Sequence, residues 1–321
     1  MHLLNKKVKF DRFYDKIAIS FFEKSLGVDH LAIISDPYNT YCKTVIDRVR
    51  ESLYMKKAVI FGVDARVDET GKELHRDLTV CASNDDVYDL YRKAPDIIIP
   101  FMSINPLRPN ALELIDKYAE MGFKGVKFLQ NYWNVDTRQD RFKPFFKKLA
   151  DMNLPIVIHI GSESSVKSHK ECEKVEMLYA PLEAGATTIA AHMGLEYSPM
   201  RLFKAFSKNP KNFGENYYRL LKMLENHDNL FADISAILTP VRAKVLPHLA
   251  KQDSITHKIL FGTDFPVPFT TLFNTHDIEL KRRKELCKIK NPFDRYIETM
   301  LEYFPKNHPI WSNYEKVLGF I

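Results

Sequence analysis

The sequence predicts an α/β fold, a (β/α)8 barrel of the TIM-barrel architecture with its first strand truncated. Short apolar runs alternate with amphipathic stretches, which favours alternating strands and helices. The runs are apolar on both faces, as is typical of buried parallel strands. They also recur at the spacing of a βα unit, about 30 residues, given ~250 residues for a whole barrel. We expect a single barrel domain over residues 1–321.

Seven apolar runs are the predicted barrel strands, because each is rich in Ile, Val or Phe and is bounded by polar residues, Pro or Gly. In chain order they are LAIIS from Leu31, IIIPFMSI from Ile97, GVKFL from Gly125, PIVIHIG from Pro155, TTIAAHMG from Thr187, NLFADIS from Asn229 and KILFGTDFP from Lys258. The missing strand has to be the one that ends at His2. Polar residues in the last five runs are 32, 33, 41 and 31 residues apart: Lys127, His159, His192, Asp233 and Asp264.

The stretches between these runs predict helices and loops. ALELIDKYAEMG from Ala111 and FKPFFKKLADMN from Phe142 have apolar residues three or four apart and end near Gly or Asn. Residues 58–83 are interpreted as an insertion between the second and third strands, a helix and a loop over the barrel mouth. The tail 268–321 predicts closing helices. An open doubly wound sheet is the alternative fold, but no G-x-G-x-x-G or Walker sequence follows any strand.

The composition is that of an ordinary globular protein. The net charge of +6 comes from 47 basic and 41 acidic residues, and the basic runs have helical periodicity without a nucleic-acid motif. Four scattered cysteines without a C-x-x-C pair favour a reducing compartment. The chain has no apolar run near the ~18 residues that span a bilayer and no signal peptide. We therefore expect a cytoplasmic protein that binds a small-molecule substrate, neither nucleic acid nor membrane, and that could form a homodimer.

The candidate site residues lie where buried strands end. In an α/β barrel the C-terminal strand ends build the active site, and His159, His192 and Asp264 stand there, each followed by Gly or Pro within a few residues. A single histidine in such a place is more often a core or capping residue. Three such side chains on one barrel converge, and a shared divalent metal satisfies imidazole nitrogen and carboxylate oxygen together. The sequence thus predicts a metal site.

The chain resembles the amidohydrolase superfamily, in the amidohydrolase-related branch that contains aminocarboxymuconate-semialdehyde decarboxylase and related hydrolases and decarboxylases. The resemblance covers most of the chain. It rests on INPLRPNALELIDKYAEMGFKGVKF before and in the fourth strand, LPIVIHIG, AAHMG, ILFGTDFP and the closing NYEKVLGF.

This resemblance implies a metal-dependent hydrolase with one divalent ion, Zn²⁺ or alternatively Mn²⁺. It makes His159 a metal ligand, and Asp264 a ligand that also takes the proton of the attacking water. His192 would orient or polarise the water or substrate, or ligate a second metal. Lys127 is expected to be uncarbamylated and to contact a substrate carboxylate, although some relatives carry a metal-bridging carbamylated lysine there. Asp233 is expected to be a supporting or structural residue, and Trp133 could line the substrate pocket.

The beginning of the chain departs from the family pattern. An H-x-H motif is expected at the end of the first strand, and only its second histidine, His2, is present as a metal ligand. Two explanations are open: the polypeptide begins upstream of Met1, or the barrel is partly open and its metal site is impaired. The first is favoured, because the downstream ligands remain and a missing strand exposes two unpaired edges.

The expected activity is hydrolysis of a small carboxylate, lactone, amide or ester by an activated water. Decarboxylation of an unsaturated acid is the alternative reaction, since it uses the same metal and His/Asp set. A degenerate, non-catalytic barrel that only binds a ligand or a partner is the rival from another class.

Overall fold

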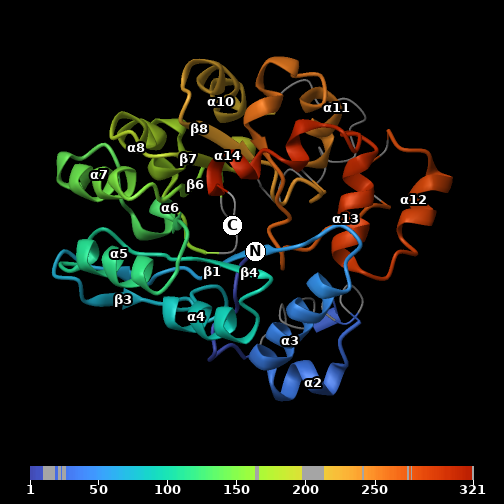
Figure 1. The fold of residues 1–321 in the computed structure, drawn as a ribbon, viewed down its shortest axis with the longest axis horizontal. Helices are drawn as coiled ribbons and strands as arrows, with labels where there is room; N and C mark the ends of the chain where they lie inside the picture. Colours follow the sequence, from blue (N-terminus) through green and yellow to red (C-terminus); the bar gives the residue numbers. More distant parts are fainter. Residues whose placement is uncertain are drawn as a thin grey trace.

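The structure is a computed structural model, and it describes residues 1–9, 19–20, 23, 27–162, 166–196, 213–240, 242–272, 275 and 277–319. Figure 1 shows strands gathered in the middle of the molecule and helices arranged around them. The fold is the α/β barrel that the sequence predicts. It places the C-terminal ends of all its parallel strands on one side, which is where the site is built.

The barrel strands are short and parallel. Their bounds are β1 Ala58–Phe61, β4 Ile98–Phe101, β5 Val126–Phe128, β6 Ile156–His159, β7 Thr188–Ala191, β8 Leu230–Asp233 and β9 Ile259–Leu260. Strands β5 to β9 pair in sequence order, and β1 pairs with β4. A bridge between Met102 and Val126 joins the two sheets.

The segment Met1–Leu3 occupies the place of the remaining strand. His2 forms a parallel bridge with Phe61, and Leu3 N donates to Phe61 O at 2.9 Å. On its other side His2 N donates to Phe265 O at 2.8 Å, beyond the end of β9. The eight segments therefore follow one another around a ring, and the joins on either side of the β5–β9 sheet are shorter than the pairings within it.

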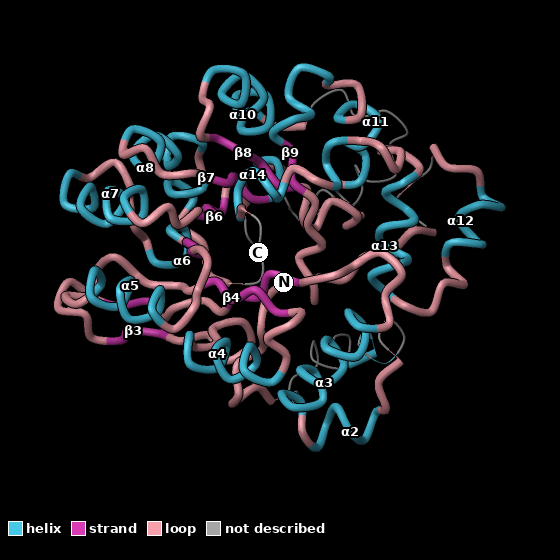
Figure 2. The backbone as a smooth tube through the Cα atoms, in the orientation of Figure 1, coloured by secondary structure: helices cyan, strands magenta, loops and turns pink. Residues whose placement is uncertain are grey.

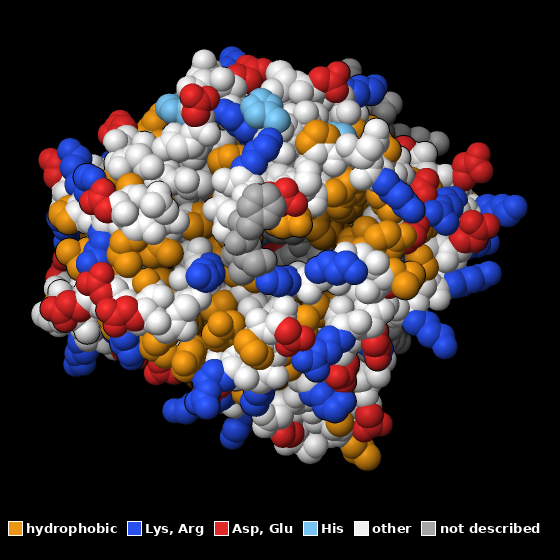
Figure 3. Space-filling view, viewed as in Figure 1, with side chains coloured by type: hydrophobic (Ala, Val, Ile, Leu, Met, Phe, Trp, Pro, Cys, Tyr) orange, Lys and Arg blue, Asp and Glu red, His pale blue; other side chains and the backbone are white. Residues whose placement is uncertain are grey.

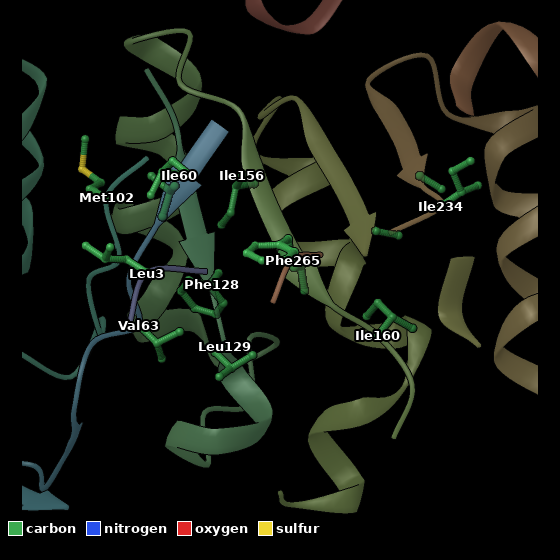
Figure 4. Close-up of a cluster of buried hydrophobic side chains, with 14 of the residues drawn as sticks. Leu3, Ile60, Val63, Met102, Phe128, Leu129, Ile156, Ile160, Ile234 and Phe265 are labelled. Atoms are coloured by element: carbon green, nitrogen blue, oxygen red, sulfur yellow. The ribbon is translucent and has the colours of Figure 1, made fainter. Parts of the chain in front are cut away.

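The strand register divides the buried side chains into two layers. Val157, Ile189, Phe231 and Leu260 belong to one cluster with Phe61 and Phe101, and they fill the barrel interior. Their neighbours along the strands pack outward against the helices in a larger cluster. Figure 4 shows part of this outer core, where Leu3, Ile60, Phe128, Ile156 and Phe265 come together from segments far apart in the sequence.

Helices surround the strands, as the cyan segments of Figure 2 show. Their bounds are α2 His30–Ser35, α3 Pro37–Arg50, α4 Asn84–Lys93, α5 Ala111–Glu120, α6 Gln130–Trp133, α7 Lys143–Asp151, α8 Tyr179–Glu183, α10 Glu215–Asn226, α11 Leu246–Leu249, α12 Leu280–Leu286, α13 Pro292–Leu301 and α14 Tyr314–Leu318. Short 3₁₀ turns include η4 His192–Gly194 and η7 Asp253–Lys258. The predicted helices over ALELIDKYAEMG and FKPFFKKLADMN are α5 and α7.

The prediction of a strand at LAIIS from Leu31 is wrong, because this run lies in helix α2. The Asp29 side chain caps this helix by accepting from Ala32 N at 3.0 Å. Ile33 is buried while Leu31 and Ile34 are exposed, so the burial follows one face of a helix. The composition of a short apolar run does not distinguish a helix from a strand, and here the cap at Asp29 favours the helix.

The interpretation of residues 58–83 as an insertion is corrected at its beginning. Ala58–Phe61 is the barrel strand β1, in register with Ile98–Phe101. The extra element follows it as an antiparallel hairpin, β2 Arg66–Val67 and β3 Glu73–His75. The barrel strand was missed because the run at Leu31 had already been counted in its place.

The tail contains helices α12, α13 and α14, as predicted, apart from residues 273–274, 276 and 320–321, which lie outside the described part. Helix α14 lies at the N-terminal ends of the strands, where Asn313 Nδ2 donates to Ile259 O at 2.8 Å. Figure 3 shows Lys and Arg side chains spread over one face of the molecule with Asp and Glu among them. Among the described residues, no helix combines the length and apolar character needed to cross a bilayer.

Candidate metal centre

The fold brings four of the predicted site residues to the C-terminal side of the barrel. His159 is the last residue of β6, and His192 follows β7 directly. Asp264 comes after β9, and His2 lies between β1 and Phe265. The convergence expected from the strand ends is thus present in the structure.

Asp264 is the centre of this group. Its Oδ1 lies 3.3 Å from His2 Nε2, and its Oδ2 lies 4.0 Å from His192 Nε2. The His192 ring meets the His159 ring edge to face, with centroids 5.1 Å apart. His159, His192 and Asp264 are all buried. One carboxylate therefore faces two imidazoles, and a third imidazole packs against one of these.

Three contacts hold His2 in place. Its amide donates to Phe265 O, and its carbonyl accepts from Tyr41 Oη at 2.6 Å. Its ring packs edge to face on Phe61 at 4.6 Å between centroids. His2 is therefore part of the barrel wall with its imidazole aimed at Asp264.

The backbone at the site is strained. His192 and Asp264 have φ of 58°, Met193 54° and Ala236 52°, all in the left-handed region. This region costs an L-residue with a side chain roughly 1–2 kcal/mol. Such conformations persist where the surrounding structure fixes them, and they concentrate at functional sites. The strained positions follow β7, β8 and β9, on the side where the imidazoles and the carboxylate meet.

The surroundings of Asp264 and His192 shift the pKa values of both side chains. Burial alone raises the pKa of the Asp264 carboxyl, but His192, His2 and Lys127 outweigh burial and hold that pKa below its ordinary value. Burial, and then the Arg242 charge, lower the pKa of His192 well below its ordinary value. The site thus favours an ionised carboxylate beside a neutral imidazole, which are the ligand forms of both groups.

Lys127 points into the barrel interior. It is paired in register with Val157, an interior residue, and it is 2% exposed. Its Nζ lies 5.3 Å from the centre of the Phe61 ring, on which His2 also packs. The ammonium group is therefore close to the His2–Asp264 pair.

Trp133 is not brought to this group. It is buried in the outer core, packs edge to face on Phe128 at 5.0 Å, and its Nε1 donates to Asp64 O at 2.9 Å. These contacts are those of a residue that packs α6 against the barrel. Its expected part in substrate binding stays a prediction.

Three further residues surround the site, and sequence reasoning missed two of them, Ser235 and Arg242. Ser235 lies between Asp233 and His192, and its hydroxyl contacts both. Gln130 Nε2 donates to the carbonyls of His159 and of Cys172, which fixes the end of β6. Arg242 is buried and its charge acts on His192. Only Ser235 carried a local signal, a hydroxyl two residues after a strand-end carboxylate.

The donors fit a divalent cation by their chemistry. The Nδ1 of His192 contacts Ser235 O at 3.0 Å, and a carbonyl can only accept, so Nδ1 carries the proton. His192 Nε2 then presents a lone pair to the Asp264 carboxylate, and two facing acceptors are stabilised by a shared cation. In the described part of the chain, no three His, Cys, Asp or Glu side chains are close enough to form a ready-made site.

The chain was compared with known families and proteins. Residues 60–282 match the family model described as Amidohydrolase, which covers more than half of the chain and includes His159, His192 and Asp264. The comparison with curated proteins gives no match.

Solved structures share the fold at low sequence identity. An uncharacterized TIM-barrel protein from Bordetella bronchiseptica is 13% identical, with a TM-score of 0.54 over 93% of this chain and 97% of that one. A probable 2-pyrone-4,6-dicarboxylic acid hydrolase from Acinetobacter baumannii is 12% identical, with a TM-score of 0.52 over 87% and 89%. The IDCase of Metarhizium anisopliae is 14% identical, with a TM-score of 0.51 over 86% and 78%. At these identities the likeness supports the fold alone.

Proposed function

Because this chain belongs to the amidohydrolase family, we propose that it is a metal-dependent hydrolase of a small carboxylate, lactone, amide or ester. The single observation that supports the reaction most is the position of Asp264, between His2 Nε2 at 3.3 Å and His192 Nε2 at 4.0 Å. An ionised carboxylate held between two imidazoles is suited both to a cation and to accepting a proton.

His2, His159 and Asp264 are the residues that would hold one divalent ion, Zn²⁺ or alternatively Mn²⁺. Such an ion supplies Lewis acidity, which polarises a substrate carbonyl and lowers the pKa of a neighbouring water towards ~7. The side chains would draw together on binding, since Asp264 already contacts His2 and faces His192.

The chain's own side chains would transfer the proton, orient the water and bind the substrate. Asp264 Oδ2, the oxygen on the side of His192, accepts the proton of the attacking water and later returns it to the leaving group. His192 Nε2 orients that water by accepting a hydrogen bond. Lys127 Nζ, buried beside Phe61, holds a carboxylate of the substrate. The new carbon–oxygen bond forms first, and the bond between the carbonyl carbon and its leaving oxygen or nitrogen breaks when that atom receives the proton from Asp264.

The test begins with metal. Purified protein is stripped with a chelator, reloaded with Zn²⁺ or Mn²⁺, and screened against lactones, esters, amides and unsaturated carboxylic acids. We expect one equivalent of metal to bind and turnover to depend on it. Asp264→Asn and His159→Asn should abolish turnover, whereas the matched exposed variants Asp253→Asn and His257→Asn should keep it.

Isotopes separate the two reactions that share this site. In ¹⁸O-labelled water, hydrolysis puts the label in the product carboxylate, whereas decarboxylation in D₂O releases CO₂ and leaves deuterium on carbon. Release of CO₂ would replace the hydrolase by a decarboxylase with the same ligands. Turnover that is unchanged in Asp264→Asn would overturn the catalytic role of Asp264. A protein that retains no metal and turns over none of the substrates would favour a ligand-binding barrel.

A further inference from the structure

The loop after β8 contains a carboxylate that contacts no imidazole directly. Asp233 Oδ1 accepts from His192 N at 2.9 Å and from Ser235 N at 3.0 Å. The same oxygen accepts from the Ser235 hydroxyl. Three donors therefore converge on one oxygen at the end of a barrel strand, beside the candidate metal centre but outside its ligand set.

The directions of these hydrogen bonds follow from counting protons. The Ser235 hydroxyl has one proton, and it is given to the Asp233 carboxylate, which can only accept. Ser235 Oγ is also 2.8 Å from His192 Nδ1, so in this contact Oγ has to accept. His192 Nδ1 then carries a proton, shared between Ser235 Oγ and Ser235 O. In the neutral imidazole the lone pair is then on Nε2.

The same carboxylate also holds the strained backbone. His192 adopts a φ of 58°, and its amide is tied to Asp233 Oδ1. Asp233 thus fixes both the main chain of His192 and, through Ser235, the side of the ring that carries the proton. The remaining ring nitrogen points to Asp264 Oδ2 at 4.0 Å.

Space for the serine depends on a glycine. A Cβ at Gly262 would lie 3.1 Å from Ser235 Cβ, which is tighter than side chains normally tolerate. Gly262 precedes Asp264 by two residues, so the loop after β9 is shaped to admit Ser235 next to the ring of His192. The hydroxyl therefore sits in a place that two strand-end loops define together.

We propose that Asp233 and Ser235 form a positioning pair, which holds His192 with its proton on Nδ1 and its Nε2 lone pair towards Asp264. His192 would then serve the site as an acceptor, towards a cation or a water, and not as a hydrogen-bond donor to the substrate. This role rests on the proposed function, whereas the arrangement of protons does not.

Nitrogen NMR of the protein labelled with ¹⁵N-histidine tests the arrangement without any turnover. The His192 signals are those that disappear in His192→Gln. We expect the metal-free protein to show a protonated Nδ1 and an unprotonated Nε2, which is opposite to the form that free histidine prefers. A protonated Nε2, or signals averaged between the two forms, would overturn the proposal.

Two variants distinguish the pair from the Ser235 carbonyl, which could fix the proton alone. In Ser235→Ala the carbonyl remains, so the Nδ1-protonated form should persist. In Asp233→Asn the amide can donate to Ser235 Oγ, which frees the hydroxyl proton for His192 Nδ1. A measurable Nε2-protonated population should then appear. If Asp233→Asn instead keeps the wild-type spectrum, the carbonyl acts alone and the positioning pair is refuted.

A matched control exists elsewhere in the chain. Ser52 Oγ donates to Asp294 Oδ1, which also accepts from Leu53 N at 3.1 Å, far from the strand ends. Ser52→Ala and Asp294→Asn should lower the thermal stability and leave the His192 signals unchanged. Altered His192 signals in this control would mean that the Asp233→Asn result reports general loosening, and would count against the pair.

Metal affinity gives a second readout. Loss of a residue that orients a ligand typically weakens metal binding about 10- to 100-fold, and we expect Asp233→Asn to fall in this range. The double variant with Ser235→Ala should bind no more weakly than Asp233→Asn alone, because both act through one contact. Additive losses would contradict the pair. A protein that binds no metal at all would refute the proposed function and leave the nitrogen spectrum to decide the inference.

Discussion

Two strand-end carboxylates, which lie on either side of the Met1–Leu3 segment, have different surroundings. Asp64, after β1, is held by Arg108, whose Nε and Nη2 donate to its two oxygens at 2.6 and 2.7 Å. Asp264, after β9, faces the imidazoles of His2 and His192. A two-pronged guanidinium contact neutralises the charge of a carboxylate and uses both of its oxygens, whereas imidazole nitrogens can share the carboxylate with a cation. A strand-end position alone therefore does not identify a site residue.

Asp64 connects several segments of the barrel mouth. It also accepts from Asn105 N at 2.9 Å, and Arg108 continues to Glu73 on the β2–β3 hairpin at 3.0 Å. The carboxylate of Asp64 raises the pKa of the Arg108 guanidinium further above its ordinary value, so the pair stays charged. The contacts around Asp64 therefore fix the β2–β3 hairpin to the barrel, whereas the candidate site residues lie around Asp264.

The largest expected effect is on catalysis. Asp264→Asn keeps the shape of the side chain and suits the left-handed backbone, since asparagine tolerates positive φ. It removes the proton acceptor, so kcat should fall about 100- to 10,000-fold. Steady-state kinetics on the substrate that the screen identifies measures this loss. Asp64→Asn should keep kcat per folded molecule, and an equal loss in both variants would erase the distinction between the two carboxylates.

The second prediction concerns metal and stability. Zn²⁺ at 100 times its Kd should stabilise the folded protein by about 2.7 kcal/mol, because the ion binds only the native state. Thermal melting with and without metal measures the shift. Asp64→Asn should show the same gain as wild type, whereas Asp264→Asn should show little. A full metal-induced shift in Asp264→Asn would mean that the ion binds elsewhere.

Much of the barrel and the main ligand positions could be predicted from the sequence because they depend on local patterns. The buried runs at Val157, Ile189 and Phe231 show strand composition, and a ligand-type residue ends each of the runs at His159 and His192. These signals need only the chain itself and the rule that barrel sites lie at C-terminal strand ends.

Other features depend on tertiary contacts and could not be predicted. Leu31 and Ile60 lie in equally short apolar runs, and only the cap at Asp29 and the pairing with β4 separate helix from strand. The packing of the Trp133 indole on Phe128 is a tertiary contact that no local pattern predicts. The contact of Ser235 with His192 joins residues 43 apart in the chain, a distance at which no spacing rule applies.

The third prediction concerns the stability of the fold, which we expect to depend more on Asp64 than on Asp264. Asp64→Asn removes the charged partner that meets both prongs of Arg108 and leaves the guanidinium only its contact with Glu73, in a place where Asp64 and Arg108 are mostly buried. Losing hydrogen bonds to a charged group costs about 1.5–3 kcal/mol, so urea unfolding should show a loss of that size. The control Asp253→Asn, at an exposed position, should stay within experimental error of wild type. A wild-type midpoint for Asp64→Asn would show that the hairpin is held by other contacts.

The smallest expected effect separates the charge of Arg108 from its geometry. Arg108→Lys keeps the positive charge but loses the planar fork that meets both oxygens of Asp64. The expected loss is about 0.5–1.5 kcal/mol, the value of an ordinary hydrogen bond, because one of the two contacts remains available. Arg76 is the matched control, since its Nη2 stands 3.8 Å from Asp64 and its forked contact is with the exposed Glu73 instead. Ion pairs at exposed positions contribute little to stability. Arg76→Lys should therefore cost less than Arg108→Lys in the same urea titration. Equal losses would show that Asp64 needs only a nearby positive charge and that the planar fork of Arg108 adds nothing to the stability.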